Sequence, residues 1–99
     1  MTEAIGECSH TEGLGTSASG DWSHAEGNRA SASGDYSHAE GYSTTASGTS
    51  SHAEGYGATA SGQNSHAEGG NLNSSAASLG EWSIANLNIS ITSTTATGI

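Results

Sequence analysis

The sequence predicts an all-β fold, a flattened roll of stacked parallel coils. Three observations predict it: an exact 14-residue repeat, alternation of small and polar residues within the repeat, and glycine at fixed places. A first phrase, Ser-His-Ala-Glu-Gly with Thr for Ala in its first copy, occupies residues 9–13, 23–27, 37–41, 51–55 and 65–69. A second phrase, Ala-Ser-Gly, runs in step at residues 18–20, 32–34, 46–48 and 60–62. Two phrases per period indicate two structural elements per coil.

The repeat favours strands over helices. Every unit contains glycine twice, and each glycine would cost a helix about 1 kcal/mol relative to alanine. In residues 23–27, the small Ser23, Ala25 and Gly27 alternate with His24 and Glu26, which is the period of a strand with one tightly packed face. The second half of the unit alternates alanine with serine or threonine in the same way. The glycine that ends each first phrase is expected to supply the backbone angles of a turn.

The small residues also predict a thin core. Coils stacked about 4.8 Å apart would form a rod of six or seven coils, roughly 30 Å long. Only Ala, Ser, Thr and Gly fit between backbones that approach so closely. Such an interior buries little apolar area, at about 25 cal/mol per Å2, so a single rod is expected to be marginal and to be stabilised by oligomerisation.

Charge and composition argue against several classes of partner. The 99 residues include ten acidic residues and one basic residue, for a formal net charge of -9. A phosphate backbone would be repelled, so no nucleic-acid binding is expected. No stretch approaches the roughly 20 apolar residues that span a bilayer, so no membrane insertion is expected. The lone Cys8 excludes an internal disulfide.

The repeat becomes irregular towards the C-terminus. Residues 1–70 hold the regular 14-residue units, and residues 71–99 are expected to form longer, irregular coils of the same domain. Residues 78–80 and 83–86 fit the two phrases if four residues are inserted. That alignment places Ile84 in the histidine column, Asn86 in the glutamate column, and Trp82 in the column that precedes each Ser.

The repeat pattern resembles a known family. Ser-x-Ala-x-Gly followed by x-x-Ala-x-Ala-Ser-Gly, at a period of 14 from about residue 4 to residue 98, is similar to the YadA-like head repeat of trimeric autotransporter adhesins. The same repeat occurs in bacteriophage tail-fibre and spike proteins. The resemblance implies a left-handed parallel β-roll, a homotrimer around a threefold axis, and a role in attachment to surfaces. In the adhesin heads the two x positions of the first phrase are usually Val and Ile at the subunit interface, whereas here they are His and Glu.

These two columns are the predicted trimer seam. Three like charges near an axis cannot be buried cheaply, so each His is expected to hydrogen-bond a Glu of its own or a neighbouring chain. A solvated stripe is the alternative, but both columns stay identical while other outward positions vary. Transition-metal ions on the axis, held by imidazole, are a less favoured alternative, and no cofactor is expected. The seam residues are His10, Glu12, His24, Glu26, His38, Glu40, His52, Glu54, His66, Glu68 and Ile84, and the axial ions would lie at His10, His24, His38, His52 and His66.

Catalysis is not expected. Ser, His and Glu recur together, but strand alternation places Ser23 and His24 on opposite faces, and an active site is not normally built five times. Two aromatic pairs have two interpretations, of which capping of the rod corner is favoured and surface recognition by stacking on sugars is the alternative. They are Trp22 with Tyr36, and Tyr42 with Tyr56.

The predicted function is that of a structural and adhesive trimeric fibre segment in a bacteriophage tail fibre or spike. Its partners would be two further copies of the chain and a host-surface receptor or glycan, and it would be located in the virion tail. The head of a bacterial cell-surface adhesin, which would be extracellular, is the alternative. The preference for a phage rests on the polar repeat and on the lack of an export signal, coiled-coil stalk or membrane anchor in the sequence. A ladder of outward hydroxyls in the second half of each coil makes an ice-binding solenoid a third possibility.

Overall fold

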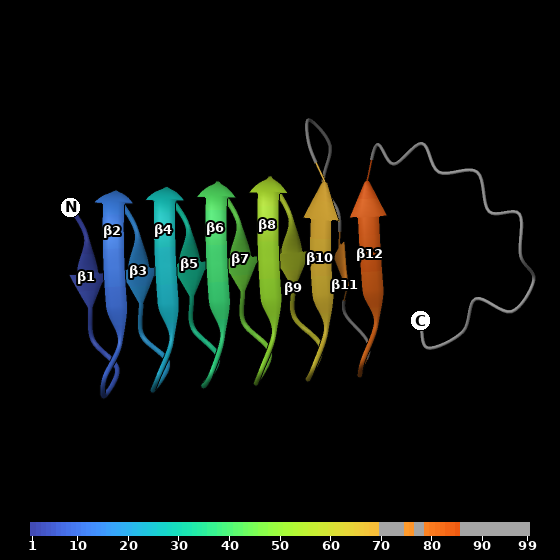
Figure 1. Cartoon of the computed structure of the whole chain (residues 1–99), viewed down its shortest axis with the longest axis horizontal. Coiled ribbons are helices and arrows are strands. Elements are labelled where there is room, and N and C mark those ends of the chain that lie inside the picture. Colours follow the sequence, from blue (N-terminus) through green and yellow to red (C-terminus); the bar gives the residue numbers. More distant parts are fainter. Residues whose placement is uncertain (70–74, 77–78, 86–99) are drawn as a thin grey trace, which may run out of the picture.

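The protein is a parallel β-solenoid built from two facing sheets (Figure 1). The structure, a computed structural model, describes residues 1–69, 75–76 and 79–85. The odd sheet consists of β1 (Glu3–Ala4), β3 (Ser17–Ala18), β5 (Ser31–Ala32), β7 (Thr45–Ala46), β9 (Thr59–Ala60) and β11 (Ser75–Ala76). The even sheet consists of β2 (His10–Leu14), β4 (His24–Asn28), β6 (His38–Tyr42), β8 (His52–Tyr56), β10 (His66–Gly69) and β12 (Trp82–Ala85). The predicted all-β solenoid is therefore confirmed. Among the described residues, no helix has the length and apolar character needed to cross a membrane.

Neighbouring coils pair in exact register. His24 of β4 pairs with His10 of β2 and with His38 of β6, so that each residue lies against its own counterpart in the next coil. The odd sheet follows the same rule, because Ala32 pairs with Ala18 and Ala46. The 14-residue period therefore becomes a set of columns that run along the rod, each with one residue type or a few.

The interior is filled almost entirely by alanine. From β3 to β11, the alanines on the small-residue face predicted for the strands are buried, whereas β1 and β2 have no buried residue and Gly27 is exposed. The buried hydrophobic residues are Ala18, Ala25, Ala30, Ala32, Ala39, Ala46, Ala53, Ala58, Ala60, Ala67 and Ala76. Serine and threonine complete this layer, and the hydroxyl of Ser23 donates a hydrogen bond of 2.6 Å to the carbonyl of Gly20. A buried hydroxyl destabilises the fold less when it donates a hydrogen bond to a backbone carbonyl.

The glycine that ends each first phrase does not form the turn, contrary to the sequence prediction. Gly27 lies inside β4 with a φ of 112°, and a Cβ there would overlap the carbonyl oxygen of Gly41 in the next coil. The turns are made at two other columns, by left-handed residues such as Trp22 (φ 55°) and Arg29 (φ 62°). The glycine column is thus required by the close approach of the backbones, as well as by its positive φ.

The left-handed corners are held by bonds to the preceding coil. The amide of Trp22 donates to the carbonyl of Glu7 at 2.7 Å, and that of Arg29 donates to the carbonyl of Leu14 at 2.8 Å. A left-handed conformation costs a residue with a Cβ roughly 1–2 kcal/mol. The hydrogen bond between coils offsets this cost, which explains how bulky side chains are accommodated at a corner.

The last described coil is longer than the others by two residues, not by four as the sequence alignment had it. Trp82 pairs with His66, and Ala76 pairs with Ala60, so both offsets are 16 residues. Trp82 therefore lies in the histidine column, and the backbone of Ile84 pairs with Glu68 in the glutamate column. Asn86 and most of the predicted irregular region at 71–99 lie outside the described residues.

The tight packing between coils predicts which glycines are indispensable. Gly34 has a φ outside the left-handed region, but an added Cβ would overlap the carbonyl oxygen of Gly48. Gly15 has a φ of 67° and open space, because the nearest atom to an added Cβ is 3.8 Å away, on Arg29. We expect Gly34→Ala to lower the free energy of unfolding by about 3 kcal/mol, and Gly15→Ala by only about 1 kcal/mol. Urea unfolding followed by circular dichroism measures both, and equal losses would contradict the proposed contact between coils.

Candidate functional site

The most regular polar feature of the molecule is a ladder of histidine and glutamate on the outer face of the even sheet. Each even-numbered strand from β2 to β10 contributes one His and, two residues later, one Glu. Alternation along the strand turns both side chains away from the alanine core. The His–Glu ladder consists of His10, Glu12, His24, Glu26, His38, Glu40, His52, Glu54, His66 and Glu68. These are the residues predicted for the seam, apart from Ile84, whose side chain is outside the description.

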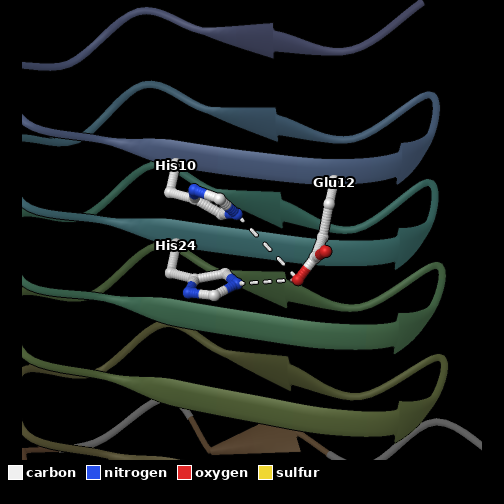
Figure 2. A group of neighbouring side chains, drawn as sticks. All are labelled: His10, Glu12 and His24. Carbon is white, nitrogen blue, oxygen red and sulfur yellow. Dashed lines mark ion pairs between the residues drawn. The ribbon is translucent and has the colours of Figure 1, made fainter.

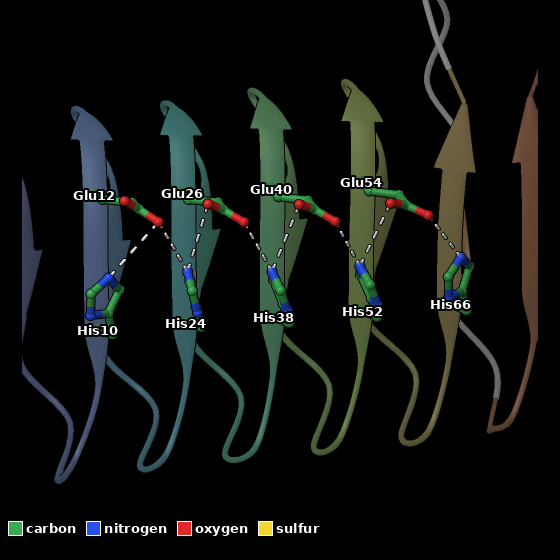
Figure 3. Close-up of polar contacts among 9 residues, drawn as sticks. All are labelled: His10, Glu12, His24, Glu26, His38, Glu40, His52, Glu54 and His66. Atoms are coloured by element: carbon green, nitrogen blue, oxygen red, sulfur yellow. Dashed lines mark ion pairs between the residues drawn. The ribbon is translucent and has the colours of Figure 1, made fainter.

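The ladder is a zigzag. From His24 to His66, the Nε2 atom of each imidazole faces the carboxylate of its own coil and that of the preceding coil. Figure 2 shows its first step, where Nε2 atoms of His10 and His24 lie 3.9 and 3.8 Å from the same oxygen of Glu12. The pattern continues along the rod in Figure 3. Its shortest separation is 3.4 Å, between Nε2 of His52 and Oε1 of Glu40, and its longest is 4.0 Å, between His38 and Glu40. The two columns are therefore brought together within one chain, as a continuous array.

The imidazole rings also stack upon one another. The rings of His24, His38 and His52 are nearly parallel, with centroids 4.6 and 4.8 Å apart in successive pairs. At the far end, the ring of Trp82 stacks on His66 at 4.1 Å with an angle of 12°. The sequence alignment placed Trp82 in the corner column and so missed this role. Trp82 is the only aromatic residue after the last Ser-His-Ala-Glu-Gly phrase, and that was the only signal in the sequence.

The nitrogen atoms that face the carboxylates are not fully satisfied. Ordinary N–H···O hydrogen bonds measure 2.7–3.2 Å, and all nine nitrogen–oxygen separations in the ladder exceed this range. Nε2 of His24, His38, His52 and His66 is shielded from solvent and has no hydrogen-bond partner in the described part of the chain. A buried polar atom without a partner costs free energy. These nitrogens are therefore left unsatisfied within the single chain.

The stacked glutamates differ in pKa, so they do not all ionise together. A hydrogen bond with Glu68, burial and a hydrogen bond with Glu40 raise the pKa of Glu54 to about 7. Burial raises the pKa of Glu40, but hydrogen bonds with Glu54 and Glu26 outweigh it and hold that pKa below its usual value. The hydrogen bond with Glu54 also lowers the pKa of Glu68. A column of like charges is thus relieved when Glu54 keeps a proton and shares it with its ionised neighbours.

Two exposed aromatic pairs accompany the ladder. Trp22 and Tyr36, at successive corners, stack with centroids 5.0 Å apart, and Tyr42 and Tyr56, at the ends of β6 and β8, stack at 4.9 Å. Each pair presents its rings at the surface, with exposures between 39% and 58%. The predicted recognition residues therefore form two stacked aromatic pairs at the surface. The backbones of Trp22 and Tyr36 are left-handed, at a corner between strands.

The outward hydroxyls of the odd sheet are also in register. Ser31 pairs with Ser17 and Thr45, and Thr45 pairs with Thr59. The neighbouring outward positions, one after each short strand, are exposed serines: Ser19, Ser33, Ser47 and Ser61. The hydroxyl ladder predicted from the sequence is thus present on the face opposite the His–Glu ladder.

The serine of each first phrase lies on the other side of the strand from the histidine. Ser23 and Ser37 are buried, and each donates its hydroxyl to a carbonyl of its own coil, at 2.6 Å. His24 and His38 project outward (Figure 3). The predicted separation of hydroxyl and imidazole is confirmed, so this arrangement does not form a serine–histidine pair.

The proton held by Glu54 predicts a pH dependence. Because its folded pKa of about 7 exceeds the ordinary 4.5, the stabilisation that it provides is complete below pH 4.5 and is lost as pH rises through 7. Glu54→Gln removes the carboxyl that must ionise. At pH 8 the variant should therefore be more stable than the parent protein by up to about 1 kcal/mol, a small effect because the side chain is partly exposed. At pH 4 the difference should vanish, and thermal melting at the two pH values measures it.

The control for this experiment is Glu3→Gln, which makes the same change of charge at an exposed position in β1, away from the ladder. It tests for a general effect of the chain's net charge of -9. If Glu54→Gln gains no more stability at pH 8 than this control, the inference that Glu54 keeps a proton in the folded protein is wrong.

Comparison with known proteins does not supply a family. No protein-family model matches the sequence, and no curated protein matches it. The resemblance to the adhesin-head repeat therefore rests on the residues of the repeat, and the function is argued below from geometry and chemistry.

Proposed function

We propose that the chain is a structural and adhesive segment of a homotrimeric fibre, of the kind found in bacteriophage tail fibres and spikes. In this proposal the roll is left-handed, and three copies surround a threefold axis with their His–Glu ladders facing one another. The observation that carries the proposal is the ladder itself, an invariant outward array with buried, unpartnered nitrogens on a rod that has only a thin core.

The thin core supports association. A buried methyl or methylene group contributes about 0.8 kcal/mol, and alanine offers one such group per side chain. Fixing each residue of the backbone costs roughly 1–2 kcal/mol. Hydrogen bonds between coils supply part of the difference, but a rod with an alanine core gains much from a second interface. The even sheet is the broader of the two, because its strands have four or five residues where those of the odd sheet have two.

The ladder suits contact with a copy of itself. Its members are half-buried within one chain, with side-chain exposures of 36% for His24 and 33% for Glu26. The Nε2 atoms of His24 and His38 lack a close acceptor, since their carboxylate neighbours stand at 3.9 and 3.7 Å, beyond hydrogen-bonding distance. Carboxylates of an adjacent chain would supply such acceptors. The seam would therefore be polar and held by charge-assisted hydrogen bonds.

Attachment is assigned to the exposed aromatic pairs. Flat rings with a polar edge are suited to stacking against sugars. The pairs Trp22–Tyr36 and Tyr42–Tyr56 each hold two nearly parallel, stacked rings at the surface. A host-surface glycan or receptor is the proposed partner, with the virion tail as the location. The head of a bacterial surface adhesin has the same requirements and remains the alternative within this proposal.

Ice binding is the second candidate, and the outward hydroxyls of the odd sheet favour it. They form two ranks in register along the rod, but one rank is entirely serine at positions 19, 33, 47 and 61. Serine presents no methyl group beside its hydroxyl, which weakens this reading. Thermal hysteresis in a solution of the protein would support it, and freezing behaviour equal to that of buffer would exclude it.

The trimer is tested by the mass of the particle in solution. Light scattering with in-line chromatography should give three times the chain mass. Glu40→Lys places a positive charge in the middle of the seam beside the histidines, and we expect it to weaken association by about 10- to 100-fold. Within one chain the new ammonium lies between the carboxylates of Glu26 and Glu54, so the coil itself should keep its circular dichroism spectrum.

The matched control is Glu7→Lys, which makes the same substitution at an exposed corner outside the ladder. It should remain trimeric. A parent protein with the mass of one chain, or a Glu40→Lys variant that associates as well as Glu7→Lys, would overturn the proposed seam.

A further inference from the structure

We propose that the His–Glu ladder is a linear array of binding sites for a divalent transition metal, with Zn2+ as the reference ion. Each site consists of ligand atoms from two successive coils of one chain. Three clusters that share no residue have the required composition: His10, Glu12 and His24; His38, Glu40 and His52; and Glu54, His66 and Glu68.

The geometry of each cluster is close to that of a zinc site. In every cluster one ligand atom per residue lies within 4.8 Å of the others. A tetrahedral ion with bonds of about 2.05 Å needs ligand atoms roughly 3.3 Å apart. The Nε2–carboxylate separations are 3.9 and 3.8 Å in the first cluster, 4.0 and 3.4 Å in the second, and 3.7 and 3.7 Å in the third. To complete each set, the Nε2–carboxylate distances would have to shorten by up to about 0.7 Å, and ligand pairs as far apart as 4.8 Å by up to about 1.5 Å.

The ligand chemistry fits the same class of ion. Imidazole nitrogen and carboxylate oxygen together suit zinc and its neighbours, and two His with one Glu leave a fourth position open. Nε2 of His24, His38, His52 and His66 has no hydrogen-bond partner among the described residues, so an ion would not have to displace one. A dication between coils would also neutralise the stacked carboxylates, which otherwise repel one another.

The stacking of the coils limits how many ions can bind. Each Nε2 has one lone pair and can ligate one ion, so His24 cannot serve both the Glu12 and the Glu26 clusters. Five histidines taken in pairs give at most two sites with two imidazoles per chain. The third site, at Glu54, His66 and Glu68, has a single imidazole and should bind more weakly. We therefore expect two tight ions and one weaker ion per chain.

This inference does not require the proposed trimer. All protein ligands of each site belong to one chain, and the open position can take a water molecule or a carboxylate of a neighbouring copy. Metal binding and particle mass are therefore measured together, in EDTA and after addition of ZnCl2. Zinc binding by single chains would support the metal sites and contradict the trimer. A particle of three chains that binds no zinc would support the trimer and contradict the metal sites.

The test is equilibrium dialysis of the full chain against ZnCl2 at pH 7.5, with the thermal midpoint as a second readout. We expect two tightly bound ions per chain and a melting temperature that rises with zinc concentration, because the ion binds the folded state. His24→Gln should lower the tight count to one, since His10 loses its partner while His38 and His52 keep theirs. The double variant His24→Gln/His52→Gln leaves no two adjacent histidines, so both tight sites should disappear. The temperature shift should fall to the small value that the weaker site at Glu54, His66 and Glu68 can give.

A matched control introduces the same two glutamines on the opposite face, as Ser33→Gln/Ser61→Gln, where both serines are exposed. It should bind zinc like the parent protein. Circular dichroism and melting in EDTA establish that every variant is folded before binding is compared. Absence of zinc binding by the parent protein at 100 equivalents, or unchanged binding by the folded double variant, would overturn the proposal.

Discussion

The structure depends on one constraint, the exact 14-residue register that the parallel hydrogen bonds between coils impose. His24 lies against His10 and His38, and Gly27 lies against Gly13 and Gly41, because each coil hydrogen-bonds its neighbour without offset. Parallel strands are about 4.8 Å apart. Each position of the coil is therefore repeated at that spacing along the rod. In the His, Glu and Gly columns every residue lies beside a copy of itself, whether or not it tolerates one. The choice of residue in each column follows from this requirement.

Each column meets the requirement in its own way. Alanine, with some serine and threonine, fills the interior because only small side chains fit between the two sheets. Glycine is needed where the backbones approach so closely that a Cβ would meet a carbonyl oxygen. Imidazole is tolerated because flat rings stack, as His38 does on both neighbours. Glutamate is the difficult case, since stacked carboxylates repel. The protonation of Glu54 and the proximity of histidine are two responses to that repulsion.

The sequence predicted the regular part of this fold because its signals were periodic. Alternation within one phrase was enough to assign Ala25 to the core and His24 and Glu26 to the outer face. The corners were harder, since glycine is the usual residue at positive φ and the phrase ended in glycine. The left-handed positions instead belong to residues such as Trp22 and Arg29, whose conformation is stabilised by a hydrogen bond to the preceding coil. A contact between coils cannot be read from the propensity of one residue.

The register of the last coil shows the same limit, and it bears on the candidate site. Aligning Ser83 with the earlier serines put Trp82 at a corner, but strand pairing puts it against His66, where its ring closes the histidine column. The side chains of the ladder were predicted, yet their pairing in a zigzag between coils depends on rotamers that a sequence does not specify.

A register that repeats a residue also repeats any site built from it, so chemistry on this rod comes in arrays. The number of sites that can be occupied at once is limited because neighbouring sites share side chains. Every histidine of the ladder's interior faces two glutamates, and every such glutamate faces two histidines. A ligand or a second chain that engages one step changes what the next step can offer. Occupation along the ladder is therefore coupled through shared side chains, without any movement of the backbone.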